Sequence, residues 1–158
     1  MALTVRPPFG TLTAVQLASL RAIAGSGPAP VVVTPWRTLA MVDLAPGAAH
    51  TELLVDLVAD EESGWQGVSA CTGSPGCSRA ETDVRALTAA AVERHPHRPA
   101  LPIHVVACPR RCGAPAGRHL DVLVQHGVVE ATLDGRVRTA VDLDQLFDDH
   151  PTPSGAGT

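Results

Sequence analysis

Four cysteines are the residues of this chain whose type and spacing point most clearly to chemistry. Cys71 and Cys77 enclose five residues, and Cys108 and Cys112 enclose three residues further along the chain. The sequence contains no other cysteine, so every thiol lies in one of two short loops rich in glycine and proline. Four thiolates are the ligand set of a cubane iron–sulfur cluster. The spacing therefore makes an iron–sulfur redox protein the first hypothesis.

Two other uses of these thiols are weaker hypotheses. Structural zinc sites favour pairs of cysteines separated by two or four residues, and the two loops enclose five and three. Disulfides require an oxidising compartment, and the first residues lack the basic stretch and apolar run of a signal peptide. An iron–sulfur site remains the preferred interpretation, although spacing alone leaves the type of cluster open.

The first half of the chain predicts the elements of a ferredoxin-like half-domain over residues 8–66. A helix should begin at Thr11 or Thr13 and reach Ala24, with Leu17, Leu20 and Ala24 on one face. Short strands follow over 31–34 and 39–42, and a second helix with an apolar stripe of Leu53, Leu54, Leu57 and Val58 begins at Pro46. The order is helix, strand, strand, helix, which indicates an α+β layer.

The second half predicts an α/β domain over residues 67–149 that presents the cysteines. We expect a helix over 78–95, with Val84, Leu87, Ala91 and Val92 on one side and Cys77 in its first turn, where the helix dipole would stabilise a thiolate. A buried strand over 101–107 should run directly into Cys108. Strands over 120–125, 128–133 and 136–141, a tight turn at Asp134-Gly135 and a helix over 143–147 complete the domain. Residues 150–158 are predicted to be a disordered tail.

Composition and charge exclude several classes of partner. The net charge of −4 gives no reason to expect nucleic acid or an anionic membrane. No apolar run approaches the roughly 18 residues that span a bilayer. We therefore predict a cytoplasmic protein, where thiols stay reduced and can bind metal.

The cysteine pattern, with a helix and a strand between the pairs, resembles the cluster motif of the nitrite/sulfite reductase family. The run Thr34-Pro35-Trp36-Arg37 resembles a segment of one branch, precorrin-3B synthase of cobalamin biosynthesis, and Phe9-Gly10 ahead of a helix resembles the start of the family's ferredoxin-like repeat. Together these segments extend over residues 8 to 145. The resemblance implies a ferredoxin-like half-unit followed by a nitrite/sulfite reductase-type [4Fe–4S] α/β domain.

The same resemblance implies the ligands and the reaction. Cys71, Cys77, Cys108 and Cys112 would hold a [4Fe–4S] cluster, and in siroheme-containing relatives the residue at the position of Cys112 also bridges to the siroheme iron. In the precorrin-3B synthase branch, a tetrapyrrole substrate is expected in the corresponding cavity, where precorrin-3A is oxidised with O2 and reducing equivalents to precorrin-3B. The macrocycle would carry the harder chemistry.

Two departures from the family pattern affect this expectation. The family commonly has glycine before its last cysteine, whereas this chain has Arg111, so the loop must bend differently or present a cation. The family also contains two repeats, and this chain contains roughly one. We therefore expect the C-terminal half of a split enzyme with a partner chain, a truncated product, or a compact relative that dimerises. Because the chain has no G-x-G-x-x-G motif, electrons would come from a ferredoxin or an NAD(P)H-dependent reductase.

Residues beyond the cysteines give weaker signals. Arginines are the natural anchors for the carboxylates of a tetrapyrrole, and Arg37, Arg110 and Arg111 are the best placed. A solvated surface side chain is the alternative for Arg37 and, more strongly, for Arg110. Trp36 could pack on the macrocycle, although a single tryptophan more often belongs to a core. The histidines lack metal-binding spacing, and His104 is expected to be hydrogen-bonded core.

Three functions remain open from the sequence. The first is an oxidoreductase resembling precorrin-3B synthase. The second is a fragment of a siroheme-dependent nitrite or sulfite reductase. The third is a non-catalytic iron–sulfur subunit that transfers electrons to a partner.

Overall fold

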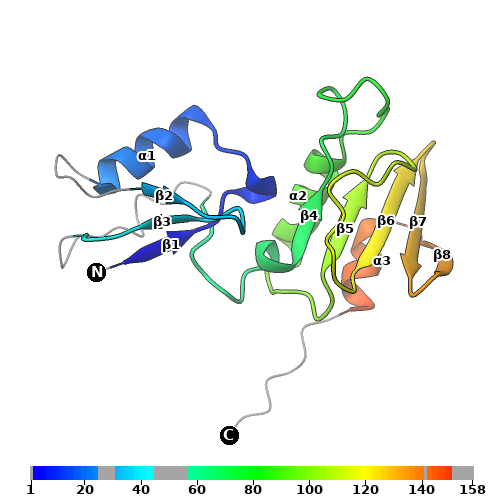
Figure 1. Ribbon diagram of the computed structural model, residues 1–158. Helices are drawn as coiled ribbons and strands as arrows, with labels where there is room; N and C mark the ends of the chain where they lie inside the picture. The colour runs from blue at the N-terminus through cyan, green and yellow to red at the C-terminus, as the bar shows by residue number, and fades with distance from the viewer. Residues whose placement is uncertain (1, 25–30, 45–56, 141, 151–158) are drawn as a thin grey trace, which may run out of the picture. The chain divides into compact units, whose positions relative to one another are not determined.

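The computed structural model describes residues 2–24, 31–44, 57–140 and 142–150 (Figure 1). The chain divides into two compact units, Met1–Glu61 and Glu62–Thr158, whereas the sequence placed the division after residue 66. Most of the helix predicted from Pro46 and the tail predicted over 150–158 lie outside the described residues. Val58 is described, and it forms an antiparallel bridge with Arg6 instead of continuing the predicted helix.

The first unit contains a three-stranded antiparallel sheet. Its strands β1 (Leu3–Val5), β2 (Val31–Val33) and β3 (Leu39–Met41) are arranged in the order β1-β3-β2. β1 lies before the predicted start of the domain at residue 8, and it pairs Val5 with Leu39. A strand of three residues is too short to show an alternating pattern in the sequence, so β1 was missed.

One helix, α1 (Ala14–Ala24), contributes to the core of the first unit. The Thr13 hydroxyl accepts a hydrogen bond from Gln16 N at 3.2 Å, and the Gln16 side-chain oxygen accepts one from Thr13 N at 2.9 Å. This reciprocal cap confirms the predicted start at Thr13. The predicted buried face is wrong in part, because Gln16, Leu20 and Ile23 are buried and Leu17 is 60% exposed.

The second unit contains a five-stranded mixed sheet. Its strands are β4 (Val68–Ala70), β5 (Ile103–Val106), β6 (Leu120–Gln125), β7 (Val128–Leu133) and β8 (Arg136–Ala140), in that order. The first three strands are parallel, and the last two form antiparallel pairs with their neighbours. A short 3-10 helix follows β1 at Pro8–Gly10 in the first unit, and another precedes β4 at Gly64–Gly67 in the second unit.

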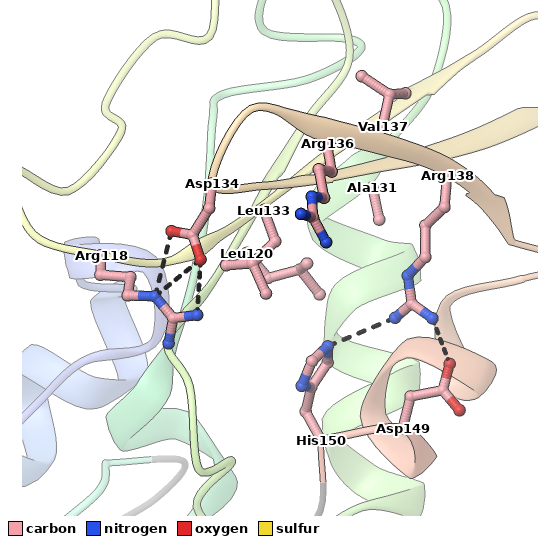
Figure 2. A pocket seen from close by; sticks show the side chains of 10 residues that line it. All are labelled: Arg118, Leu120, Ala131, Leu133, Asp134, Arg136, Val137, Arg138, Asp149 and His150. Carbon is pink, nitrogen blue, oxygen red and sulfur yellow. Dashed lines mark hydrogen bonds and ion pairs between the residues drawn. The ribbon is translucent and has the colours of Figure 1, made fainter.

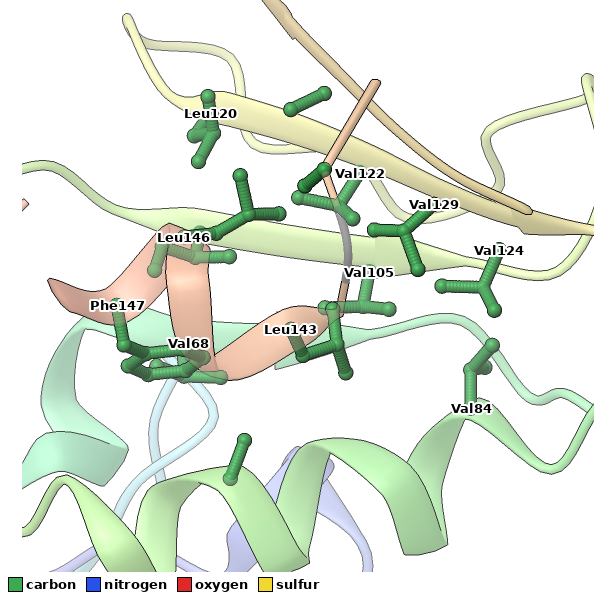
Figure 3. Close-up of a cluster of buried hydrophobic side chains, with 14 of the residues drawn as sticks. Val68, Val84, Val105, Leu120, Val122, Val124, Val129, Leu143, Leu146 and Phe147 are labelled. Atoms are coloured by element: carbon green, nitrogen blue, oxygen red, sulfur yellow. The ribbon is translucent and has the colours of Figure 1, made fainter. Parts of the chain in front are cut away.

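The core of the second unit lies between this sheet and two helices, α2 (Val84–Arg94) and α3 (Leu143–Asp148) (Figure 3). Ile103 and Val105 of β5 point into this core, together with Leu146 and Phe147 of α3. His104 alternates with them along the strand and therefore points to the opposite face of the sheet. The two faces thus differ in kind: the face toward the helices is apolar, and the other carries polar groups.

The helix predicted over 78–95 begins later than expected. Asp83 caps it by accepting a hydrogen bond from Ala86 N at 3.0 Å, so residues 78–83 belong to the loop. The predicted apolar side is also partly wrong, because Leu87 is 44% exposed and Thr88 is fully buried. Thr88 satisfies its hydroxyl inside the helix by donating to Val84 O, which lets a polar residue occupy a core position.

Local turn signals predicted the remaining elements well. The turn between β7 and β8 has Asp134 at φ 50° and Gly135 at φ 77°, the conformation that a two-residue hairpin requires. Asp142 caps α3 by accepting a hydrogen bond from Gln145 N at 3.0 Å, so the helix begins where the sequence predicts it. Among the described residues, no helix is both long and apolar enough to cross a membrane.

Candidate functional site

The first cysteine loop begins where β4 ends. Cys71 N donates to Val105 O at 2.9 Å, which continues the parallel pairing with β5. Cys71 Sγ then accepts a hydrogen bond from Ala107 N at 3.4 Å. Because parallel strands end at the same edge of a sheet, the fold places Cys71 beside the residue that precedes Cys108. These two predicted ligands therefore share one edge of the sheet.

The backbone of this loop is fixed by α2 and by a glycine. Arg85 Nε donates to Cys71 O at 3.2 Å, and Cys77 N donates to Gly73 O at 2.9 Å. Gly73 has φ 66°, and an added Cβ would lie 2.9 Å from Val84 Cγ2. Cys77 lies in this turn, seven residues before the first residue of α2, so the predicted place in the first turn of a helix is wrong.

The second cysteine loop begins just after β5. Arg111 N donates to Cys108 O at 3.2 Å, and Arg111 adopts a left-handed φ of 50°. Glycine adopts this conformation at little cost. Glycine is also the residue commonly found at this position in the family pattern that the chain resembles. The Arg111 guanidinium lies 2.7 Å from Asp121 Oδ2, while Asp121 Oδ1 is buried and has no hydrogen-bond partner among the described residues. The loop thus keeps a turn suited to glycine and uses the arginine for an ion pair.

A row of three polar residues crosses the sheet beneath this loop. Ser69, His104 and Asp121 are directly paired in the register of β4, β5 and β6. His104 is fully buried; its Nδ1 lies 2.8 Å from Ser69 Oγ and its Nε2 lies 3.1 Å from Cys112 O. This confirms His104 as hydrogen-bonded core. A nucleophilic triad requires serine at Nε2 and the carboxylate at Nδ1, so the contact of Ser69 with Nδ1 does not match one.

The four thiols are free, and their chemistry fits a cluster better than a single ion. Cys71, Cys77 and Cys108 are half-buried and Cys112 is exposed. In the part of the chain that the structure describes, no group of three or more His, Cys, Asp or Glu side chains is gathered to hold one metal ion. A cubane cluster binds each thiolate to a separate iron, so its ligands surround a larger body. Four soft donors in two loops of the second unit are the kind of ligands that such a cluster takes.

The tetrapyrrole contacts predicted from the sequence belong to different units. Thr34 to Arg37 form the turn between β2 and β3 in the first unit, where Thr34 N donates to Thr38 O at 3.0 Å. Trp36 is 74% exposed, so the expectation that it belongs to a core is wrong. Arg37 is also exposed, and its stem lies 3.2 Å from the position of an added Cβ on Gly10. Arg111 belongs to the second unit.

A cavity of about 820 Å³ gathers arginines that the sequence reasoning did not select (Figure 2). It lies where β6 begins, at the opposite end of the parallel strands from Cys71 and Cys108. Its lining residues are Arg118, Leu120, Ala131, Leu133, Asp134, Arg136, Val137, Arg138, Asp149 and His150. The alternation of Arg136 and Arg138 along one strand was the signal that could have shown them on one face.

Ion pairs organise this cavity. Arg118 donates to both carboxylate oxygens of Asp134, the shortest contact being 2.7 Å, and this bonding lowers the pKa of Asp134. Arg138 Nη1 lies 2.7 Å from Asp149 Oδ2. Burial, and then the charge of Arg138, lower the pKa of His150. Arg136 has no ion-pair partner within the described ranges, and Figure 2 shows its guanidinium between the two pairs.

Comparison with known proteins supports the fold. The chain is similar to the structure of the NirA protein of Mycobacterium tuberculosis, with a TM-score of 0.62 and 18% sequence identity. The similarity covers 93% of this chain and 33% of NirA, so the chain spans about a third of the length of that protein. No family model matches the sequence. No curated protein matches it either. The architecture of this chain is an α+β fold like that of NirA.

Proposed function

We propose that this chain is the cluster-binding part of an iron–sulfur oxidoreductase, with a [4Fe–4S] cluster on Cys71, Cys77, Cys108 and Cys112. The observation that carries the proposal is the placement of Cys71 and Cys108 after neighbouring parallel strands, with Ala107 N donating to Cys71 Sγ. Hydrogen bonds to the ligand sulfurs are among the features by which a protein adjusts an iron–sulfur cluster. The fold, which is like that of the nitrite/sulfite reductases, supports the same interpretation.

The residues of the chain would perform distinct tasks at such a site. The bound cluster would supply one-electron transfer. Arg85 and Gly73 fix the first loop, and His104 and the Arg111–Asp121 pair fix the second. Cys112 is the exposed member of the set, which suits a ligand that faces a second group.

For the reaction, we favour oxidation of precorrin-3A to precorrin-3B. The turn that resembles the precorrin-3B synthase segment exposes an indole and a guanidinium on adjacent residues, Trp36 and Arg37. A flat ring beside a cation suits a macrocycle that carries carboxylates. The Arg111 guanidinium is already paired with Asp121, so we rank Arg111 below Arg37 as an anchor for carboxylates.

Two other functions have specific support. Similarity to NirA favours a fragment of a siroheme-dependent nitrite or sulfite reductase, in which Cys112 would also bridge the siroheme iron. The presence of all four cysteines in the second unit favours an iron–sulfur subunit that transfers electrons to a partner chain. In each case a ferredoxin or an NAD(P)H-dependent reductase would donate electrons.

The cluster proposal is tested by anaerobic purification followed by iron, sulfide and zinc analysis. We expect about four irons and four sulfides per chain. The matched pair is Cys77→Ser and Ser78→Ala, which alter adjacent residues of one loop: the first should lose the cluster and the second should keep it. Zinc without sulfide in the unaltered protein would contradict the proposal.

The choice of macrocycle is tested by tryptophan fluorescence during titration with siroheme. The chain has two tryptophans, Trp36, which is exposed, and Trp65, which is half-buried in the second unit. If Trp36 contacts the ring, quenching should persist in Trp65→Phe and disappear in Trp36→Phe. Equal quenching in both variants would contradict the contact. Sharp siroheme bands in the purified protein would favour the reductase over the precorrin enzyme.

A further inference from the structure

A buried imidazole on the sheet contacts the second cysteine loop directly. His104 is fully buried on β5, eight residues before Cys112, and its Nε2 lies 3.1 Å from the Cys112 carbonyl oxygen. A backbone carbonyl only accepts hydrogen bonds, so Nε2 must carry a proton and donate it. The contact therefore specifies which ring nitrogen is protonated.

Ser69 orients the ring from its other side. Ser69 Oγ lies 2.8 Å from Nδ1 and 3.5 Å from Ile103 O. The residues Ser69 and His104 are paired in the β4–β5 register, so two rigid strands set the position of both groups. A ring bonded at both nitrogens and fully enclosed has one orientation, and its Nε2 can then fix the atom that it contacts.

The loop itself needs such external contacts. Arg111 has φ 50° and Gly113 has φ 84°, so left-handed residues flank Cys112 on both sides. An isolated chain seldom holds a non-glycine residue in this region. The Arg111–Asp121 ion pair fixes one side of Cys112, and the hydrogen bond from His104 fixes Cys112 itself.

We propose that His104 is a positioning residue for Cys112, which it acts on through the backbone carbonyl and not through the thiol. Ser69 orients the imidazole ring of His104, and the ring binds the carbonyl oxygen of Cys112. This contact fixes the backbone of Cys112 and thereby the position of its exposed sulfur. The inference that this sulfur then meets an iron rests on the proposed function. The contact between His104 and the loop does not depend on the proposed function, and it can be measured in protein without a cluster.

The test compares His104→Gln with His104→Asn. The glutamine amide nitrogen can reach the place of Nε2 and donate to Cys112 O, whereas the shorter asparagine amide reaches only the place of Nδ1. Thr88→Val is the control for loss of a buried polar group, because Thr88 lies on α2 and bonds within that helix. In the cluster-free full chain, we measure hydrogen exchange of residues 108–114 and the alkylation rate of Cys112 relative to Cys77.

We expect His104→Asn to speed exchange in residues 108–114 by about tenfold or more, and His104→Gln and Thr88→Val to stay within about threefold of the unaltered protein. Unchanged exchange in His104→Asn, or equal loosening in all three variants, would overturn the proposal. If His104→Asn fails to fold, imidazole 15N spectra of the unaltered protein still decide. A proton on Nε2 that is hydrogen-bonded supports the proposal, and its absence overturns it.

In protein that carries the cluster, the reduction potential and the paramagnetic resonance spectrum should change in His104→Asn and be restored in His104→Gln. A general loss of stability, as in Thr88→Val, would not produce that pattern. If the unaltered chain binds no iron, the proposed function fails, while the exchange data still show whether His104 holds the loop. The two failures are therefore distinguishable.

Discussion

The two cysteine loops are anchored by different parts of the second unit. The first loop is held by strand pairing and by α2: Cys71 N continues the pairing of β4 with β5, and the Arg85 side chain of α2 donates to Cys71 O. The second loop is held by side chains that rise from the polar face of the sheet, His104 beneath Cys112 and Asp121 beside Arg111. The first loop continues the strand pairing of the sheet, and the second loop is held by side chains that project from the sheet.

The difference predicts how each loop responds to substitution. Steric changes should damage the first loop, because its backbone packs closely against the start of α2. Loss of single polar groups should loosen the second loop and leave the core between the sheet and the helices intact. A cluster that spans both loops would depend on each of them.

The largest effect should come from removing one ligand from either loop. Cys71→Ser and Cys112→Ser should each lose nearly all iron and sulfide, because a cubane requires four thiolates and each loop supplies two. Metal and sulfide analysis of the anaerobically purified variants checks this. Cluster content at the unaltered level in either variant would show that the two loops do not share one site.

The next effect should arise in the first loop from Gly73→Ala. Gly73 has φ 66°, and an added Cβ would lie 2.9 Å from Val84 Cγ2 and 3.1 Å from Val84 N. Backbone strain and overpacking together should lower the free energy of unfolding by about 2–4 kcal/mol. Urea unfolding measures the change. Gly117→Ala is the control, since nothing lies within 4 Å of its added Cβ, and it should stay within about 0.5 kcal/mol.

A smaller change in the free energy of unfolding is expected at Arg111, where backbone strain and an ion pair act in opposite directions. Arg111→Gly relieves the left-handed φ of 50° but leaves Asp121, whose side chain is 14% exposed, without its guanidinium. A double-mutant cycle with Asp121→Asn should give a coupling free energy of about 1 kcal/mol, because the arginine is partly solvated. The cycle is measured by urea unfolding. A coupling near zero would mean that the pair does not fix the second loop.

The smallest effect should come from a contact that touches neither loop. Asp144 joins α3 to the end of α2, and its hydrogen bond from Arg94 lowers the pKa of the carboxyl. A carboxyl whose pKa is lowered by folding stabilises the folded protein fully when the pH is above the pKa of that carboxyl in the unfolded chain. This stabilisation is lost as the pH falls through the pKa of the folded state. Asp144→Asn should therefore cost about 0.5 kcal/mol at pH 7 and almost nothing near pH 2.

Thermal unfolding of Asp144→Asn across that pH range provides the measurement. Cluster content should stay at the level of the unaltered protein, which makes this variant a reference for the two loops. A stability difference that grows as the solution becomes more acidic would have the wrong sign for a carboxyl with a lowered pKa.

Local signals explain the parts of the fold that the sequence predicted. β6 and β7 have the predicted bounds, and Asp134-Gly135 forms the expected turn, because glycine and alternating apolar residues act over a few neighbours. The start of α2 was predicted too early, since Ser78 to Thr82 have acceptable helix propensities and the capping bond of Asp83 decides the boundary. Helix propensity predicts the first residue of a helix poorly where a capping hydrogen bond fixes the boundary at a later residue.

The supports of the second loop were beyond sequence reasoning for a different reason. His104 was expected to be hydrogen-bonded, but its partners Ser69 and Cys112 follow from strand register and from the path of the crossover. Arg111 was noted as a departure from glycine, and only the structure pairs it with Asp121. Contacts between residues on separate strands carry no local pattern, so they remain unpredicted even when each residue is noticed.

Anaerobic native mass spectrometry can show whether the two loops together hold one [4Fe–4S] cluster. We expect a single species whose added mass equals four irons and four sulfides, and we expect this added mass to be absent from both Cys71→Ser and Cys112→Ser. An unaltered chain that carries only zinc, or a cluster that survives the loss of either cysteine, would contradict this expectation.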